Sequence, residues 1–135
     1  SLTSFDQNLN LKAVFELKRE NEQPNHACGN TKLLWHGSRL TNFVSILKQG
    51  LRTAPPHAPK TGYMYGKGVY FGDCFGTSQQ YCHISKELSD GLILLNEVDL
   101  GQVLEVDEKD GKYMTNTELF FNNKHSVLAK GQSTP

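Results

Sequence analysis

A continuous apolar run from Leu92 to Leu95 constrains the fold of this chain more than any other feature. The run is bounded by Gly91 and shows no alternation with polar residues, so it suits a central strand that is buried on both faces. Such a strand needs neighbours on both sides, since a bare edge invites pairing or aggregation. Further apolar residues continue the predicted sheet around Gly101: Val98, Leu100, Val103, Leu104 and Val106.

Other segments predict short strands and helices around that sheet. Residues 11–18 alternate apolar and charged side chains, which is the period of a half-buried strand. Residues 33–35 and 69–71 are short apolar runs and read as strands, whereas residues 78–83 suit a helix. Many strands with few helices favour the α+β class.

A helix is expected after Thr41, which can cap it, because Phe43, Val44, Ile46 and Leu47 follow at helical spacing. Gly50 stands where a helix C-terminus often needs a positive φ. The Pro- and Gly-rich residues 52–68 then predict a long loop, and loops of that length are usually functional or disordered. From Asp107 onward the chain is polar, and an irregular course is expected.

Length and charge limit the class of protein. The 135 residues fit one domain, and a net charge of zero argues against unaided binding of a nucleic-acid backbone. Residues 1–67 carry nine Lys and Arg against four Asp and Glu, and residues 68–135 carry five against ten. Two solvated faces explain this asymmetry best, and the alternative is a basic half that faces an anionic ligand. No apolar run is long enough to span a bilayer. The three cysteines are an odd number without close pairs, which predicts reduced thiols in an intracellular protein. Their spacing also argues against a zinc site.

Four clusters could carry chemistry, and each also has a purely structural interpretation. They are residues 36–38 (His-Gly-Ser), residues 62–68 with three glycines, residues 68–73, and the pair Ser78 and Tyr81, spaced to share a helical face. A glycine beside a histidine lets a ligand approach the backbone, and two tyrosines can sandwich a flat ring. Taken one at a time, the clusters are better explained by a satisfied histidine, a turn and ordinary aromatic packing.

The exact residues of these motifs and their order along the chain favour a functional interpretation over a structural one. The sequence resembles the poly(ADP-ribose) polymerase family, closest to its DNA-dependent branch, from about Phe15 to Pro135 and most densely over residues 33–82. The matching words are LLWHGSR at 33–39, GLR at 50–52, APP at 54–56, TGYM at 61–64, GKGVYF at 66–71, YC at 81–82 and KHSV at 124–127.

The resemblance implies a binding site for NAD⁺ as a substrate, with no metal. In this site, His36 and Tyr70 would be the catalytic residues, and His36 would hydrogen-bond the adenosine ribose. Gly37 and Ser78 would hold the nicotinamide carboxamide, and Tyr81 would stack on the nicotinamide ring opposite Tyr70. The remaining donor-site residues are expected to be Ser38, Asn42, Arg52 and Phe71, with Tyr63 and Met64 on a loop over the donor.

The same resemblance implies an ADP-ribosyltransferase fold, with a mixed, mainly antiparallel two-sheet core and flanking helices. His36, Tyr70 and Tyr81 are expected to converge on one cleft. Residues 1–135 would form a single catalytic domain whose last strands are missing. It would transfer ADP-ribose to protein acceptors with release of nicotinamide, and it would act in the nucleus. It would bind nicotinamide-like inhibitors. It would contact DNA only through other domains, and no contact with a membrane is expected.

The resemblance also has departures. The family's catalytic glutamate lies on a later strand, and none of Glu97, Glu105, Glu108 and Glu118 matches its motif, so this exact chain is expected to transfer little ADP-ribose. Thr77 replaces a lysine of polymerising relatives, and Gly72 replaces another small residue, which is expected to be harmless. The alternative function is a degenerate domain that binds NAD⁺ or ADP-ribose without turnover.

Overall fold

The computed structural model describes residues 9–22, 27–53, 65, 67–107 and 123–130. Strands and short helices both occur in these ranges, which confirms the α+β class. In chain order the elements are β1 (Thr31–Gly37), η1 (Leu40–Asn42, a 3₁₀ helix), α1 (Phe43–Gln49), α2 (Phe75–Gln79), η2 (Gln80–Cys82, also 3₁₀), β2 (Ile93–Asp99), β3 (Val103–Asp107) and β4 (Ser126–Lys130).

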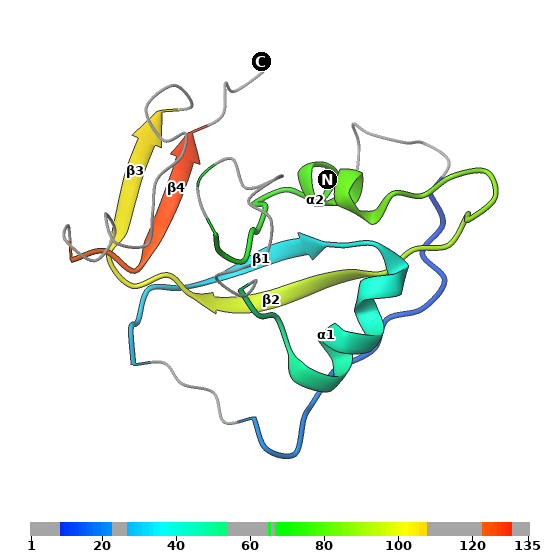
Figure 1. Ribbon diagram of the computed structural model, residues 1–135, viewed down its shortest axis with the longest axis horizontal. Helices are drawn as coiled ribbons and strands as arrows, with labels where there is room; N and C mark the ends of the chain where they lie inside the picture. Colours follow the sequence, from blue (N-terminus) through cyan, green and yellow to red (C-terminus); the bar gives the residue numbers. More distant parts are fainter. Residues whose placement is uncertain (1–8, 23–26, 54–64, 66, 108–122, 131–135) are drawn as a thin grey trace.

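The described strands form two separate two-stranded sheets (Figure 1). β1 pairs antiparallel with β2, with Thr31 opposite Asp99 and Gly37 opposite Ile93. β3 pairs parallel with β4, with Val103 opposite Ser126. The expected two-sheet architecture is therefore present, with one antiparallel and one parallel pair in the described part of the chain.

The prediction of a central strand at residues 92–95 is wrong for the described part of the chain. β2 begins at Ile93, and its only described neighbour is β1. The side chain of Leu95, opposite Trp35, is 52% exposed. The described helices are too short to cover the sheet, since α2 has five residues and α1 has seven.

Two other predicted strands are also absent among the described residues. Residues 11–18 form no strand despite their alternation, and Leu11 and Phe15 are 82% and 76% exposed. The run at 69–71 is reduced to one bridge between Gly72 and Trp35. Alternation gives a strand only where a partner supplies hydrogen bonds, and none of the described strands pairs with residues 11–18.

The helix predicted after Thr41 forms, but its start differs from the expectation. Thr41 lies within η1, and α1 begins at Phe43 after Asn42 without a side-chain cap. At the other end Gly50 has φ +81°, as predicted, and its N–H donates to the Ile46 carbonyl at 2.7 Å. Arg19 also donates to that carbonyl, at 3.1 Å, so the segment before β1 is attached to the end of α1.

The helix predicted at residues 78–83 is displaced towards the N-terminus. It runs as α2 from Phe75 and continues as the 3₁₀ turn η2, which ends at Cys82 and is followed by His83 in the left-handed region. α2 packs against β1, where the rings of Phe75 and Trp35 meet edge to face at 5.4 Å. The buried apolar side chains of the described part are Phe43 and Cys82.

β4 falls in a region for which an irregular course was expected. Its first residue and the residue before it are joined to the corner between β2 and β3. Ser126 donates through Oγ to the Leu100 carbonyl at 2.7 Å, and the N–H of His125 donates to the Gln102 carbonyl at 2.9 Å. None of the helices in the described ranges is long and apolar enough to cross a bilayer.

Candidate functional site

The end of β1, the bridge at Gly72 and the helix α2 meet at one junction. Trp35 and Gly72 exchange two backbone hydrogen bonds, of 2.8 and 2.9 Å. Ser78, which is 3% exposed, donates through Oγ to the same Trp35 carbonyl at 3.1 Å. One residue of β1 thereby holds both Gly72 and the helix α2, which are distant from β1 in sequence.

Gly37 and Ser78, the residues expected to hold a carboxamide, lie against each other. A Cβ added to Gly37 would lie 1.8 Å from the carbonyl oxygen of Ser78. No side chain fits there, because atoms that close overlap deeply. The lack of a side chain at position 37 therefore permits the close packing of β1 on α2.

His36 and Tyr70 are joined by a hydrogen bond of 2.7 Å between the ring nitrogen Nδ1 and the Tyr70 carbonyl oxygen. A carbonyl oxygen only accepts, so Nδ1 carries the hydrogen. In the neutral ring, Nε2 is then an acceptor for a hydroxyl donor. The ring of Phe71 meets the His36 ring edge to face at 5.7 Å, and the Tyr65 N–H donates to the Tyr70 hydroxyl at 2.9 Å.

Three further residues expected at the donor site are Ser38, Asn42 and Arg52, of which the resemblance implies that Asn42 and Arg52 line the adenosine half. Asn42 donates through Nδ2 to the Ser38 hydroxyl at 3.0 Å, which joins these two. Arg52 is exposed, and its Nε donates to the Gln49 carbonyl at the end of α1. In the described part of the chain Arg52 makes no hydrogen bond to His36 or Ser38, so its role stays a prediction.

Tyr81 and Ser78 do not share one buried face. Ser78 is buried in α2, whereas Tyr81 lies in η2 with its side chain 54% exposed. The turn from α-helix to 3₁₀ helix separates them. The expected convergence of Tyr81 with His36 and Tyr70 stays a prediction, and Tyr63 and Met64 lie outside the described residues.

Two groups at this junction were missed by the sequence analysis. One is the Trp35 carbonyl, which no residue pattern reveals. The other is Cys82, whose buried thiol donates to the Leu92 carbonyl at 3.3 Å and would lie 3.2 Å from a Cβ at position 37. Burial raises the pKa of the Cys82 thiol, and a backbone hydrogen bond from Ser38 opposes this less strongly. In the sequence, only the YC motif at 81–82 indicated that Cys82 belongs to this junction.

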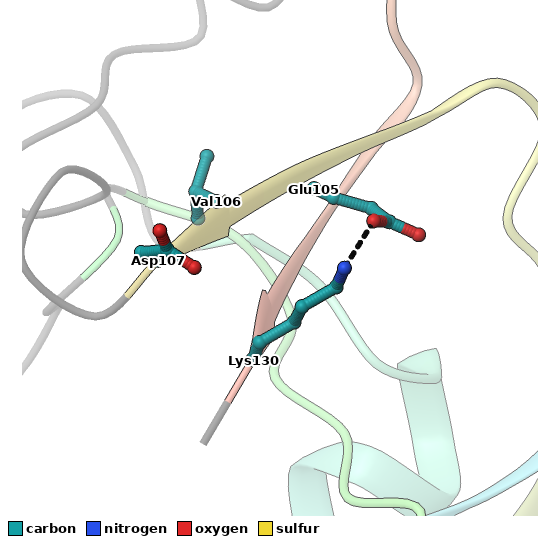
Figure 2. Close-up of a pocket in the computed structure, with 4 residues that line it drawn as sticks. All are labelled: Glu105, Val106, Asp107 and Lys130. Atoms are coloured by element: carbon teal, nitrogen blue, oxygen red, sulfur yellow. Dashed lines mark ion pairs between the residues drawn. The ribbon is translucent and has the colours of Figure 1, made fainter. Parts of the chain in front are cut away.

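A depression lies on the β3–β4 sheet, away from these residues in sequence. Figure 2 shows Glu105 and Lys130 facing each other across the two strands, with Val106 and Asp107 beside them. Lys130 Nζ lies 2.6 Å from Glu105 Oε2, and this contact lowers the pKa of the Glu105 carboxyl. Glu105 is therefore engaged in an exposed ion pair, while Glu97 lies on β2 opposite Leu33.

The fold and the residues of this junction fit one protein class, and comparison with known families identifies it. Residues 2–135 match the poly(ADP-ribose) polymerase catalytic domain, so the chain belongs to that family. The resemblance of the motifs noted above is thereby confirmed.

Individual relatives are similar over nearly the whole chain. The protein called poly [ADP-ribose] polymerase 1 of Arabidopsis thaliana is 49% identical over 138 residues, which cover 98% of this chain. The poly [ADP-ribose] polymerase of Drosophila melanogaster is 48% identical over 98% of the chain, and polymerase 1 of Danio rerio is 47% identical over 94%. The chain spans only 14%, 13% and 12% of the lengths of these three relatives.

Proposed function

We propose that this chain binds NAD⁺ and belongs to an enzyme that transfers ADP-ribose to protein acceptors with release of nicotinamide. The observation that carries the proposal is the approach of Gly37 to Ser78 within a family of ADP-ribosyltransferases. Both residues match the family positions that hold the nicotinamide carboxamide, and here β1 and α2 bring their backbones into contact.

The residues present suit such a donor. His36 is set as the Nδ1–H tautomer by Tyr70, so Nε2 accepts a hydroxyl hydrogen from the adenosine ribose. The backbone of Gly37 offers an N–H and a carbonyl for an amide, and Ser78 adds a hydroxyl. The exposed ring of Tyr81 is available for stacking on the nicotinamide, and Tyr70 would form the opposite wall.

The contribution of these groups is positioning. Cleavage of the nicotinamide–ribose bond passes through an oxocarbenium-like state, as glycoside cleavage does. A rigidly held leaving group and an oriented ribose lower that barrier, because positioning converts a loose encounter into an organised reaction. Action in the nucleus on protein acceptors, and contact with DNA only through other domains, are part of the same proposal.

A domain that binds NAD⁺ without turnover is the second candidate. The positions of two described glutamates favour it. Glu105 forms an ion pair with Lys130, and Glu97 lies on β2 opposite Leu33. Neither Glu97 nor Glu105 matches the family's catalytic motif.

Incubation with NAD⁺ labelled in the adenine half separates the two candidates when the chain is extended at its C-terminus by the segment that follows the matching region in the Arabidopsis thaliana relative, because residues 1–135 alone are expected to transfer little under either hypothesis. Label transferred to protein with equimolar release of nicotinamide supports the enzyme. Saturable binding without transfer supports the binding domain, and the absence of both contradicts the proposed function.

A further inference from the structure

We propose that Cys82 is a positioning residue for the peptide group that joins Gly37 to Ser38. Its thiol bridges the Ser38 N–H and the Leu92 carbonyl where β1 and β2 end, and thereby directs the Gly37 carbonyl towards the donor site. The inference rests on the proposed function, because the backbone of Gly37 is assigned there to the nicotinamide carboxamide.

The hydrogen-bond pattern between β1 and β2 fixes the side to which the backbone of Gly37 faces. At one end of the ladder, the Leu100 N–H donates to the Asn30 carbonyl at 3.1 Å. Bonded and non-bonded pairs alternate in an antiparallel ladder, so the odd-numbered residues of β1 turn their backbone groups away from β2. Trp35 follows this rule, since both of its groups bond to Gly72 on the other side. The N–H and carbonyl of Gly37 therefore point to that other side as well.

The next step of the ladder is occupied by sulfur. The last pair is Gly37 with Ile93. By the same alternation, Ser38 would next exchange hydrogen bonds with Leu92. Instead the thiol of Cys82 donates to the Leu92 carbonyl at 3.3 Å, and its sulfur accepts a hydrogen bond from the Ser38 N–H. A thiol can serve in both ways, because it is a weak donor and a weak acceptor.

This bridge has a consequence for the Gly37 carbonyl. The carbonyl and the Ser38 N–H belong to one planar trans peptide group, in which they point in opposite directions. A sulfur that binds the N–H on the side of β2 therefore holds the carbonyl on the free side of β1. Glycine restrains its own backbone least of all residues, so an external bond to this peptide group has more to fix here than elsewhere. Cys82 thus acts through the peptide group and not through a contact with the donor.

The thiol is itself held in place. Cys82 is 5% exposed and ends η2, which continues directly from α2. Another acceptor for its hydrogen is the Ser78 carbonyl, but the sulfur lies 3.9 Å from that oxygen and only 3.3 Å from the Leu92 carbonyl. Ser78 lies four residues earlier in the same helical segment. One segment therefore positions both groups assigned to the carboxamide, the Gly37 backbone and the Ser78 hydroxyl.

The bridge is tested first without any ligand, by hydrogen exchange of the Ser38 amide. In the wild-type chain we expect this amide to exchange at least about tenfold more slowly than a free amide, because it is bonded to sulfur. Cys82→Ala should remove that protection, and Cys82→Ser should retain most of it, since a hydroxyl also donates and accepts. An unprotected Ser38 amide in the wild-type chain, or equal protection in Cys82→Ala, overturns the inference.

The effect on binding is tested by calorimetric titration of benzamide, which carries the carboxamide. We expect Cys82→Ala to weaken binding about five- to tenfold and Cys82→Ser less than about threefold, because a single hydrogen bond has an effect of this size. Alanine and serine are close in volume, so the two variants differ mainly in hydrogen bonding. A packing role predicts the reverse order, because burial of a hydroxyl without partners is unfavourable. Cys28→Ala, at an exposed thiol, is the control and should bind as the wild type does.

ADP-ribose, which lacks the carboxamide, separates positioning from general damage. It should bind the wild-type chain and Cys82→Ala equally. Benzamide binding that is at least as strong in Cys82→Ala as in Cys82→Ser, or equal weakening of benzamide and ADP-ribose in Cys82→Ala, contradicts the inference.

Two outcomes need separate interpretation. If benzamide fails to bind the wild-type chain, the proposed function is contradicted, while exchange of the Ser38 amide still decides the bridge. If Cys82→Ala fails to fold, Cys82→Ser is the deciding variant. Retained protection of Ser38 and retained benzamide affinity in that variant support the inference, and loss of either overturns it. If neither variant folds, exchange of the Ser38 amide in the wild-type chain decides.

Discussion

The two ring nitrogens of His36 have different partners, and this difference separates a structural role from a binding role. Nδ1 donates to the Tyr70 carbonyl, which ties β1 to the segment before α2. Nε2 is the nitrogen that the proposed function assigns to the ribose. A substitution that keeps one and removes the other distinguishes the two roles.

His36→Asn places an amide donor near the position of Nδ1 and removes Nε2. We expect the free energy of unfolding to change by less than about 1 kcal/mol and NAD⁺ affinity to fall about tenfold, which is the loss of one hydrogen bond of about 1.4 kcal/mol. Chemical denaturation and calorimetry measure the two quantities. His83→Asn is the control, since Asn tolerates the left-handed backbone of that exposed residue. Unchanged NAD⁺ affinity in His36→Asn would remove Nε2 from the site.

Gly37 tests the packing of the same strand on α2. Gly37→Ala directs a methyl group at the backbone carbonyl oxygen of Ser78 at 1.8 Å. The direction of that methyl group is set by the β1 backbone, so neither group moves cheaply. We expect a loss of about 3 kcal/mol in the free energy of unfolding, at the upper end for overpacking. Urea denaturation of this variant beside Gly68→Ala, which should stay within about 0.5 kcal/mol of wild type, checks the assignment. Equal stability of the two variants contradicts it.

The three thiols should react at different rates. Cys28 and Cys74 are exposed, whereas Cys82 is buried at the Gly37–Ser78 contact. The raised pKa of Cys82 leaves less thiolate at any pH below it, and the thiolate is the reactive form. At pH 8, labelling with a thiol reagent should proceed in a fast phase of two thiols and a slow phase of one. Cys82→Ala should remove the slow phase alone, and its loss in Cys74→Ala instead would contradict the burial.

At the scale of elements, the corner between β2 and β3 joins the two sheets. Gly101 has φ +58°, its N–H donates to the Gly29 carbonyl before β1, and the ring of His125 before β4 packs directly against it. The Gln102 N–H donates to Nδ1 of that ring at 3.0 Å, so the side chain of His125 is part of the corner.

Gly29 and Gly101 form a matched pair for testing this corner. Both have positive φ, but a Cβ on Gly29 meets nothing within 4 Å, whereas one on Gly101 would lie 2.6 Å from the His125 ring. Gly29→Ala should cost only the backbone strain of about 1–2 kcal/mol, and Gly101→Ala about 1–3 kcal/mol more. Thermal denaturation of the two variants measures the difference, and equal losses would show that the His125 contact contributes nothing.

The sequence allowed prediction of elements whose cause is local. The positive φ of Gly50 follows from its place after a helix, and the strand at residues 33–35 from a short apolar run. Elements that depend on a distant partner were missed or misplaced. Residues 11–18 alternate but lack a described partner strand, and β4 exists because β3 lies beside it. Of the site, the contact of Gly37 with Ser78 was implied only by the family motif.

At the scale of the whole molecule, family membership covers residues 2–135, whereas the described core is small. Apolar side chains of residues 9–17 are exposed, and β2 has one described neighbour. The junction of β1 with α2 is nevertheless closely packed, because two glycines, Gly37 and Gly72, remove side chains where the backbones meet. The proposed binding site at this junction is therefore expected to be the best-ordered part of the described chain.

NAD⁺ is proposed to bind at the junction of β1 and α2. The most direct test is titration of the ¹⁵N-labelled chain with NAD⁺, followed through the backbone amide resonances. We predict saturable shifts at residues 36–38 and 78–81, with Glu105 and Lys130 on the second sheet unchanged. Shifts confined to β3 and β4, or no saturable shift at Gly37 and Ser78, would contradict the account.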